Sequence, residues 1–174
     1  MESNKNLVLV GMMGSGKSTI GYLLSKKLNL KFIDIDRHIE EESGYKISDI
    51  FNKKGEIYFR EIEKKISLRF MKLNKQVIAL GGGGFMNENI RTEVISNHIS
   101  FWLNWNNITL IKRLKLSKKR PLVRDLSEED IKKIIYKRTK IYSLANYKIN
   151  CEKFSKNEIV KKIINFYNDN QIIS

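Results

Sequence analysis

The stretch Leu7-Val8-Leu9-Val10-Gly11-Met12-Met13-Gly14-Ser15-Gly16-Lys17-Ser18-Thr19 decides the fold of this chain. An apolar run of strand length leads into a complete G-x-x-x-x-G-K-[ST] motif, the phosphate-binding loop (P-loop) that joins a strand to a helix. Its glycines let backbone N–H groups turn inward around phosphates at the start of that helix. Lys17 is expected to reach the β- and γ-phosphates, and the Ser18 hydroxyl to ligate Mg²⁺. The motif predicts a nucleoside triphosphate site, the alternative being a glycine-rich turn that binds nothing.

Apolar runs of strand length alternate along the chain with longer helical patterns. The runs lie at 7–10, 32–35, 77–80, 99–103 and, more weakly, 147–151. Helices are expected at 17–28, 47–51, 56–73, 89–96, 109–116, 128–144 and 155–168. Continuously apolar strands are covered on both faces, so the pattern predicts an α/β fold with a parallel sheet between helices. Ligands bind such sheets beyond the carboxyl ends of the strands.

Length and composition limit the class of protein. The chain has 174 residues, enough for one well-packed domain, and a single cysteine, Cys151, so no disulfide forms within it. No run approaches the roughly 20 apolar residues of a membrane span, and residues 1–6 lack the pattern of a signal peptide. We therefore expect a cytoplasmic protein without a membrane partner, in which Cys151 is a small packing residue.

The net charge of +14 raises the question of nucleic-acid binding. Only eight of the 33 basic residues are arginines, and the lysines are scattered along the predicted helices. This pattern is typical of solvated helix faces, and no nucleic-acid-binding motif accompanies it. We predict no nucleic-acid partner, because a small anionic substrate accounts for local basic clusters.

Two carboxylates follow the second apolar run, in Phe32-Ile33-Asp34-Ile35-Asp36. If the strand continues through this segment, Asp34 and Asp36 project to the same side, next to the P-loop. One can then serve a metal and the other a phosphate acceptor, whereas the alternative is a turn or a helix cap. The third and fourth runs end at Gly81 and Asn104, so Asp34 is the predicted acid for Mg²⁺, acting through water.

Four consecutive glycines, Gly81 to Gly84, follow the third run. Glycine costs conformational entropy, so the run predicts a backbone that another group approaches closely, with N–H groups available to an anion or hydroxyl. Arg60 and Arg138 stand out in a lysine-rich chain because a guanidinium binds a carboxylate through two contacts. Glu63 lies one turn after Arg60 and could orient it. The alternatives are a permissive turn and ordinary solvated helix residues.

We expect one domain, residues 1–174. Two segments of it are longer than a simple alternation of strands and helices requires. Residues 36–63 lie in the long connection between the second and third runs and form a candidate substrate-binding subdomain. Residues 115–126 are strongly basic, contain the only proline, Pro121, and are expected to form a mobile lid.

These motifs resemble those of shikimate kinases, in that family's order and approximate spacing over about residues 7–150. The motifs that match are the P-loop, Asp34-Ile35-Asp36, Phe59-Arg60 with Glu63, the glycine run, Arg120-Pro121, and Arg138 with Tyr142. The resemblance implies a three-layer sandwich like that of nucleoside monophosphate kinases, with a central five-stranded parallel sheet, a substrate-binding subdomain and a lid. It implies transfer of the γ-phosphate of MgATP to the 3-hydroxyl of shikimate, on the route to chorismate and the aromatic amino acids.

The resemblance also implies roles for the matching residues, in a protein expected to be a monomer. Those implied in ATP binding are Gly14, Ser15, Gly16, Lys17, Ser18, Thr19, Arg113 and Arg120. Those implied in shikimate binding are Asp36, Arg60, Gly81, Gly82, Gly83 and Arg138. Lys17, Asp36 and Arg120 are the implied catalytic residues, with Asp36 taking the proton of the acceptor hydroxyl. Ser18 and Asp34 are implied at Mg²⁺, and Arg113 is expected to stack on adenine.

One departure from the family pattern concerns the adenine site. Family members often carry an Arg and a Pro in the loop after the last strand, whereas this chain has Glu152-Lys153-Phe154-Ser155-Lys156-Asn157. The adenine contacts at this end of the site therefore have to come from other groups, such as the backbone.

Two other hypotheses stay open. A gluconate or nucleotide kinase would share the P-loop and the general architecture, although the glycine run and the paired arginines argue against it. A basic P-loop protein that hydrolyses ATP as a switch would not need a small acid. ATP turnover with and without shikimate separates these alternatives.

Overall fold

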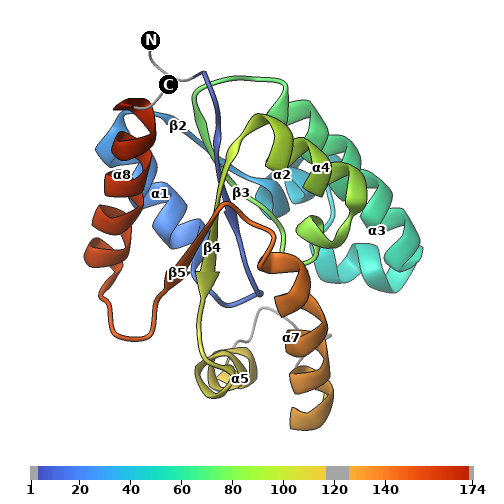
Figure 1. Ribbon diagram of the computed structural model, residues 1–174. Coiled ribbons are helices and arrows are strands. Elements are labelled where there is room, and N and C mark those ends of the chain that lie inside the picture. The colour runs from blue at the N-terminus through green and yellow to red at the C-terminus, as the bar shows by residue number, and fades with distance from the viewer. Residues whose placement is uncertain (1–3, 117–125, 173–174) are drawn as a thin grey trace.

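The computed structural model describes residues 4–116 and 126–172, with side chains as far as residue 168. One parallel sheet has the strand order β2-β3-β1-β4-β5. Its strands are β1 (Leu7–Val10), β2 (Lys31–Asp34), β3 (Gln76–Ala79), β4 (Ile99–Asn104) and β5 (Tyr147–Asn150). The central five-stranded parallel sheet expected from the sequence is confirmed (Figure 1).

Helices cover both faces of this sheet (Figure 1). On one face lie α1 (Lys17–Leu28) and α8 (Lys156–Ile172), and on the other lie α2 (Ile35–Ser43), α3 (Ile47–Met71), α4 (Glu88–Asn97) and α7 (Glu128–Tyr142). The short helix η1 (Gly84–Met86) follows β3, and α5 (Asn107–Leu116) follows β4. In β1, Leu7 and Leu9 enter the core on the α1 side, while Val8 and Val10 enter the other core. Both faces are therefore buried, as the continuous apolar runs predict.

A helix begins immediately after β2, which corrects the predicted strand over 32–35. The Asp34 carboxylate caps this helix, α2, by accepting from the backbone N–H of Arg37 at 3.3 Å. Ile35 extends the apolar pattern of the strand, but its side chain is buried as the first residue of α2. Asp36 consequently lies in the first helical turn, so the argument that strand alternation pairs it with Asp34 is wrong.

Gly55 divides α3 into two helical pieces, as the separate patterns at 47–51 and 56–73 predict. Its φ of 80° and ψ of 172° suit glycine and interrupt the helix. Residues 36–63 form α2 and the first part of α3, and their role as a substrate-binding subdomain stays a prediction.

Most of the predicted lid lies outside the described residues. Positions 117–125 are not among them, so the structure does not test the predicted role of Arg120 in the lid.

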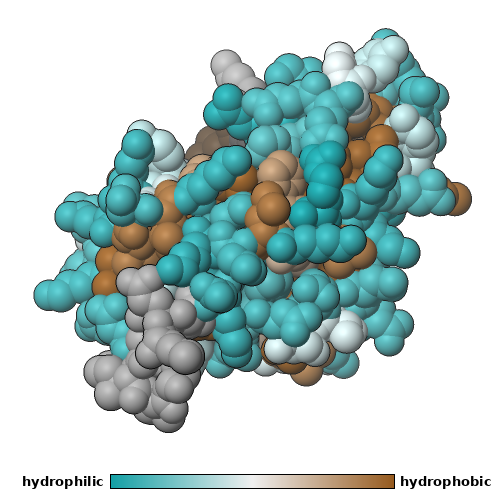
Figure 2. All heavy atoms as spheres, turned by 90° about the horizontal axis from the view of Figure 1, so that it is seen from above, coloured by the Kyte–Doolittle hydropathy of each residue, from teal (hydrophilic) through white to brown (hydrophobic). Residues whose placement is uncertain are grey.

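The surface carries most of the polar residues. Seen from above, it is largely hydrophilic, with apolar side chains in small separate groups (Figure 2). Within residues 4–116 and 126–172, no helix combines the length and the apolar character of a membrane span. Cys151 is buried in the core beneath α8, and burial raises the pKa of its thiol to about 12, which confirms it as a packing residue.

Candidate active site

The P-loop joins the carboxyl end of β1 to α1 in the middle of the sheet. Gly14 has a φ of 78° and Gly16 a φ of 90°, a left-handed backbone that side-chain-bearing residues rarely adopt. Gly16 is the residue that precedes α1, and Ser18 and Thr19 are exposed in its first turn. The loop thus presents the positive end of a helix to an anion, as the motif predicts.

Lys17 is held by the loop to which it belongs. Its ammonium Nζ donates to the carbonyl oxygens of Gly11 at 2.8 Å and Met12 at 3.0 Å, and the residue is only 7% exposed. These contacts fix a positive charge beside the phosphate-binding backbone. Charge placed in this way needs little rearrangement to stabilise a transferring phosphate.

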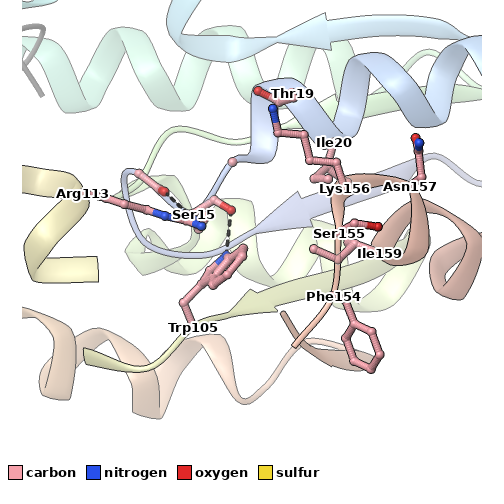
Figure 3. A pocket seen from close by; sticks show the side chains of 12 residues that line it. Ser15, Thr19, Ile20, Trp105, Arg113, Phe154, Ser155, Lys156, Asn157 and Ile159 are labelled. Atoms are coloured by element: carbon pink, nitrogen blue, oxygen red, sulfur yellow. Dashed lines mark hydrogen bonds between the residues drawn. The ribbon is translucent and has the colours of Figure 1, made fainter. Parts of the chain in front are cut away.

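A pocket of about 730 Å³ lies beside the P-loop (Figure 3). Its walls come from the loop and α1, from the residues that follow β4, and from the loop after β5. The residues that line it are Gly14, Ser15, Gly16, Thr19, Ile20, Trp105, Arg113, Phe154, Ser155, Lys156, Asn157 and Ile159. This volume falls within the range of about 300 to 1,000 Å³ typical of small-molecule sites.

Arg113 reaches this pocket from α5, and its role in ATP binding stays a prediction. Its guanidinium carbon lies 3.7 Å from the ring centroid of Trp105, and its Nη1 donates to the carbonyl oxygen of Gly14 at 3.4 Å. Trp105 did not emerge from the sequence as a site residue. Its position directly after the carboxyl end of β4 was the available signal, because ligands bind at that edge.

The glycine run after β3 is the meeting point of the predicted acceptor residues. A Cβ at Gly81 would lie 2.6 Å from Asp36 Oδ1 and would overlap Glu63 Oε1. A Cβ at Gly83 would overlap the guanidinium of Arg60. None of the four glycines has a positive φ, so the run serves close approach by other side chains rather than an unusual backbone.

Arg60 and Glu63 form an ion pair at this place. Arg60 Nη1 donates to Glu63 Oε2 at 2.7 Å, and Arg60 Nη2 lies 3.0 Å from the Glu56 carboxylate. Burial raises the pKa of the Glu63 carboxyl, the positive charge of Arg60 opposes this shift, and Asp36 adds to it. Glu63 Oε1 is buried and receives no hydrogen bond from the described residues. The pair therefore fixes the guanidinium against the glycine run and keeps a polar oxygen available beside Gly81.

Arg138 and Tyr142, one turn apart on α7, hold the glycine run from the other side. Arg138 Nη1 donates to the Gly82 carbonyl oxygen at 3.1 Å, and the Tyr142 hydroxyl donates to the same oxygen. Burial raises the pKa of Tyr142 to about 12, so its hydroxyl keeps the proton that it donates. Arg138 Nη1 also lies 3.8 Å from the sulfur of Met12 in the P-loop. The predicted acceptor residues and the P-loop are therefore neighbours.

The fold and this site define a kinase of the P-loop class. A family model described as shikimate kinase matches residues 13–168. A shikimate kinase from Sulfurihydrogenibium sp. (strain YO3AOP1) is 44% identical over 160 residues, which cover 92% of this chain and 96% of the relative. The chain belongs to the shikimate kinase family, whose enzymes are ATP-dependent kinases that act on shikimate.

Solved structures agree with this family. The shikimate kinase from Acinetobacter baumannii, in complex with shikimate, has a TM-score of 0.90 at 29% identity, with 97% of this chain and 96% of that chain covered. The shikimate kinase from Aquifex aeolicus has a TM-score of 0.85 at 36% identity, with 95% and 98% covered. The sandwich of sheet and helices described above is thus the fold of this family.

Proposed function

We propose that this chain transfers the γ-phosphate of MgATP to the 3-hydroxyl of shikimate, giving shikimate 3-phosphate for chorismate biosynthesis. The observation that carries the proposal is the convergence of Arg60, Arg138 and Asp36 on the glycine run beside the P-loop. Two guanidinium groups and a carboxylate suit an acceptor that has both a carboxylate and hydroxyl groups.

The donor site is proposed to hold ATP with its phosphates in the P-loop. Backbone N–H groups of residues 14–19 would bind the phosphate oxygens at the start of α1. Lys17 would neutralise charge on the transferring group, and the base would lie in the pocket that Arg113 lines. Arg120 is proposed to close over the γ-phosphate from the lid.

The acceptor site is proposed to hold shikimate against the glycine run. Arg60 and Arg138 would bind the carboxylate, and the backbone of residues 81–83 would lie against the ring. Asp36 would accept a hydrogen bond from the acceptor hydroxyl and take its proton as the oxygen attacks the γ-phosphate. Its position in the first turn of α2, within reach of the glycine run, supports this role.

Mg²⁺ is proposed as the cofactor that bridges the phosphates. Ser18 and Asp34 supply oxygen donors, the kind that Mg²⁺ prefers. Within the described part of the chain, no group of three or more His, Cys, Asp or Glu side chains is placed to hold a metal. A metal bound mainly by phosphate oxygens and water fits this donor set, and it would neutralise charge on the phosphates. The cytoplasmic location and the monomeric state stay predictions.

A coupled assay of ADP release tests the function directly. Shikimate, quinate, gluconate and the nucleoside monophosphates are compared as acceptors, with a reaction lacking any acceptor as the control. Turnover that depends on shikimate supports the proposal. Equal turnover without an acceptor would point to an ATP-hydrolysing switch, and preference for gluconate or a nucleotide would contradict the proposed acceptor.

A further inference from the structure

The carbonyl oxygen of Gly82 accepts hydrogen bonds from two residues of α7. Arg138 Nη1 donates to it at 3.1 Å, and the Tyr142 hydroxyl donates to it as well. A carbonyl oxygen has two lone pairs, so it can accept both bonds at once. The two donors lie one turn apart on the same face of the helix. The position of this oxygen therefore depends on both side chains.

Tyr142 is held in place by the core of the protein. The residue is 2% exposed, and its ring packs against Trp102 of β4, with the ring centroids 6.2 Å apart. Burial raises the pKa of its hydroxyl to about 12, although the nearby charge of Arg138 opposes the shift. The hydroxyl thus stays a donor at neutral pH. Arg138 itself is only half-buried, so its position depends more on local contacts.

The guanidinium of Arg138 is attached to the glycine run through Nη1. Its Nε and Nη2 form another edge, whose two N–H groups match the two oxygens of a carboxylate. A hydrogen bond from Nη1 to Gly82 leaves this edge for a ligand. Arg60 differs, because its Nη1 donates to Glu63 while its Nε and Nη2 donate to Glu56. Of the two arginines, Arg138 can thus bind a carboxylate through two points without first giving up a carboxylate of the protein.

The P-loop holds Gly82 from its other side. A Cβ at Gly82 would lie 3.0 Å from the backbone nitrogen of Met13, so the segment packs closely against the loop. The Tyr142 hydroxyl restrains the same peptide from α7. The peptide is therefore restrained from two directions, and its oxygen is a fixed anchor for Arg138.

We propose that Tyr142 is a positioning residue for binding of the acceptor carboxylate. Its hydroxyl fixes the Gly82 oxygen, and this oxygen holds Nη1 of Arg138. The Nε and Nη2 edge of Arg138 then meets the carboxylate in a two-point contact. Tyr142 acts through Arg138 and contributes no bond of its own to the acceptor. The inference rests on the proposed function, because it takes shikimate as the acceptor.

Tyr142→Phe tests this role, because the substitution removes the hydroxyl and keeps the ring against Trp102. The Gly82 oxygen keeps Arg138 as a donor, so the variant should fold, and thermal melting checks this. Dissociation constants are measured for shikimate, for shikimate carboxamide, which lacks the negative charge, and for a non-hydrolysable ATP analogue. Tyr136→Phe is the matched control, because Tyr136 lies exposed on the same helix.

The expected loss is confined to the ligand that has a carboxylate. In Tyr142→Phe, shikimate should bind about 3- to 10-fold more weakly, the effect of one neutral hydrogen bond. The carboxamide and the ATP analogue should bind as they do to the wild type, and Tyr136→Phe should bind all three ligands normally. A purely structural role of Tyr142 would loosen the whole site. Shikimate and the carboxamide would then weaken by the same factor, which would overturn the inference.

A double-mutant cycle shows whether Tyr142 acts through Arg138. In Arg138→Lys the two-point edge is absent, so adding Tyr142→Phe should weaken shikimate by about 2-fold at most. Equal effects of Tyr142→Phe in the wild-type and Arg138→Lys backgrounds would overturn the inference, and so would unchanged shikimate affinity in Tyr142→Phe. Failure of the proposed function looks different, because the wild type itself would then not prefer shikimate to its carboxamide. That result would overturn both proposals.

Discussion

Arg60 donates across 2.7 Å to a Glu63 carboxylate that is only 1% exposed, so the guanidinium proposed to bind the acceptor is anchored by a buried carboxylate. Burial disfavours the ionised form of Glu63 and so raises the pKa of its carboxyl, and the positive charge of Arg60 offsets part of this effect. It also limits the positions that Arg60 can adopt beside the glycine run. We therefore expect shikimate recognition at this site to depend on the shape of the cation as well as on its charge.

We expect that lysine cannot restore shikimate binding in place of Arg60 or Arg138 at the proposed acceptor site. In Arg60→Lys and Arg138→Lys the charge stays, but one ammonium cannot reproduce a planar two-point contact worth about 1.5 to 3 kcal/mol per charge-assisted bond. Shikimate affinity should fall by roughly 10- to 100-fold, while affinity for an ATP analogue changes little. Isothermal titration with each ligand measures this, and wild-type shikimate affinity in both variants would contradict the proposed acceptor.

Glu63→Gln should flatten the dependence of stability on pH. The raised pKa of Glu63 means that the folded protein keeps this proton to higher pH than the unfolded chain does. Its contribution to stability is therefore lost as pH rises from about 4.3, the ordinary carboxyl value, through the raised pKa. Glutamine has no proton to release, so this slope disappears.

Denaturant unfolding at several pH values, about 4 to 8, tests this prediction. Glu61→Gln is the matched control, because Glu61 is exposed on the same helix. If the free energy of unfolding varied with pH in the same way for the wild type and Glu63→Gln, Glu63 would not be the source of the pH dependence.

Gly83→Ala should damage acceptor binding and spare the donor site. The new methyl group would overlap the end of the Arg60 side chain, which is flexible enough to move away. The protein should therefore fold, with shikimate KM raised about 10-fold or more and ATP KM unchanged. Gly84→Ala is the control, because its nearest atom, Glu63 Oε1, would lie 3.4 Å away, an ordinary contact. Equal KM values in the two variants would count against the proposed position of Arg60.

Lys17→Met should abolish measurable phosphoryl transfer, because the transferring group loses its fixed positive charge. The Gly11 carbonyl also loses its donor, whereas the Met12 carbonyl keeps the backbone N–H of Ser15 at 3.1 Å, so we expect a stability loss of about 1 to 3 kcal/mol from the one carbonyl left unpaired. The coupled assay and thermal melting measure the two effects. Lys27→Met, on the exposed face of α1, should change neither. Near-normal turnover in Lys17→Met would refute the role of the P-loop.

Asp36→Asn should lower kcat by about 100-fold or more, because an amide can position the acceptor hydroxyl but cannot take its proton. Shikimate KM should change much less. Steady-state kinetics at saturating ATP separates the two parameters. A rise in KM alone would make Asp36 a binding residue only.

The parts of the fold that depend on local sequence were predictable. The P-loop motif gave the bounds of β1 and α1, because glycines and an apolar run fix the conformation within a few residues. The helix α2 was missed because apolar Ile35 continues the strand pattern. The only sequence signal for the start of α2 is Asp34, a residue type that often caps helices. A single capping residue is a weaker signal than a continuous apolar run, so the run was taken to extend the strand.

The acceptor site shows where reasoning from sequence stops. The glycine run predicted a close approach, and the structure identifies the approaching groups as Asp36, Arg60 and Glu63. The pairing of Arg60 with Glu63 one turn later on α3 was expected from their spacing. Their approach to Asp36 of α2 and to the glycine run comes from the tertiary fold, and no local pattern encodes it. Trp105 was overlooked for a related reason, since a single aromatic residue after a strand is indistinguishable from a core residue until its neighbours are known.

Gly82 has the P-loop on one side and α7 on the other. A side chain there would meet the Met13 backbone nitrogen at 3.0 Å, while Arg138 and Tyr142 hold its carbonyl oxygen. A shift of the loop on nucleotide binding would therefore move the groups that we propose to hold the acceptor, and thermodynamic linkage makes the effect mutual. The potency of an inhibitor aimed at either substrate site should depend on whether the other is filled, so a screen against this enzyme needs both occupancy states.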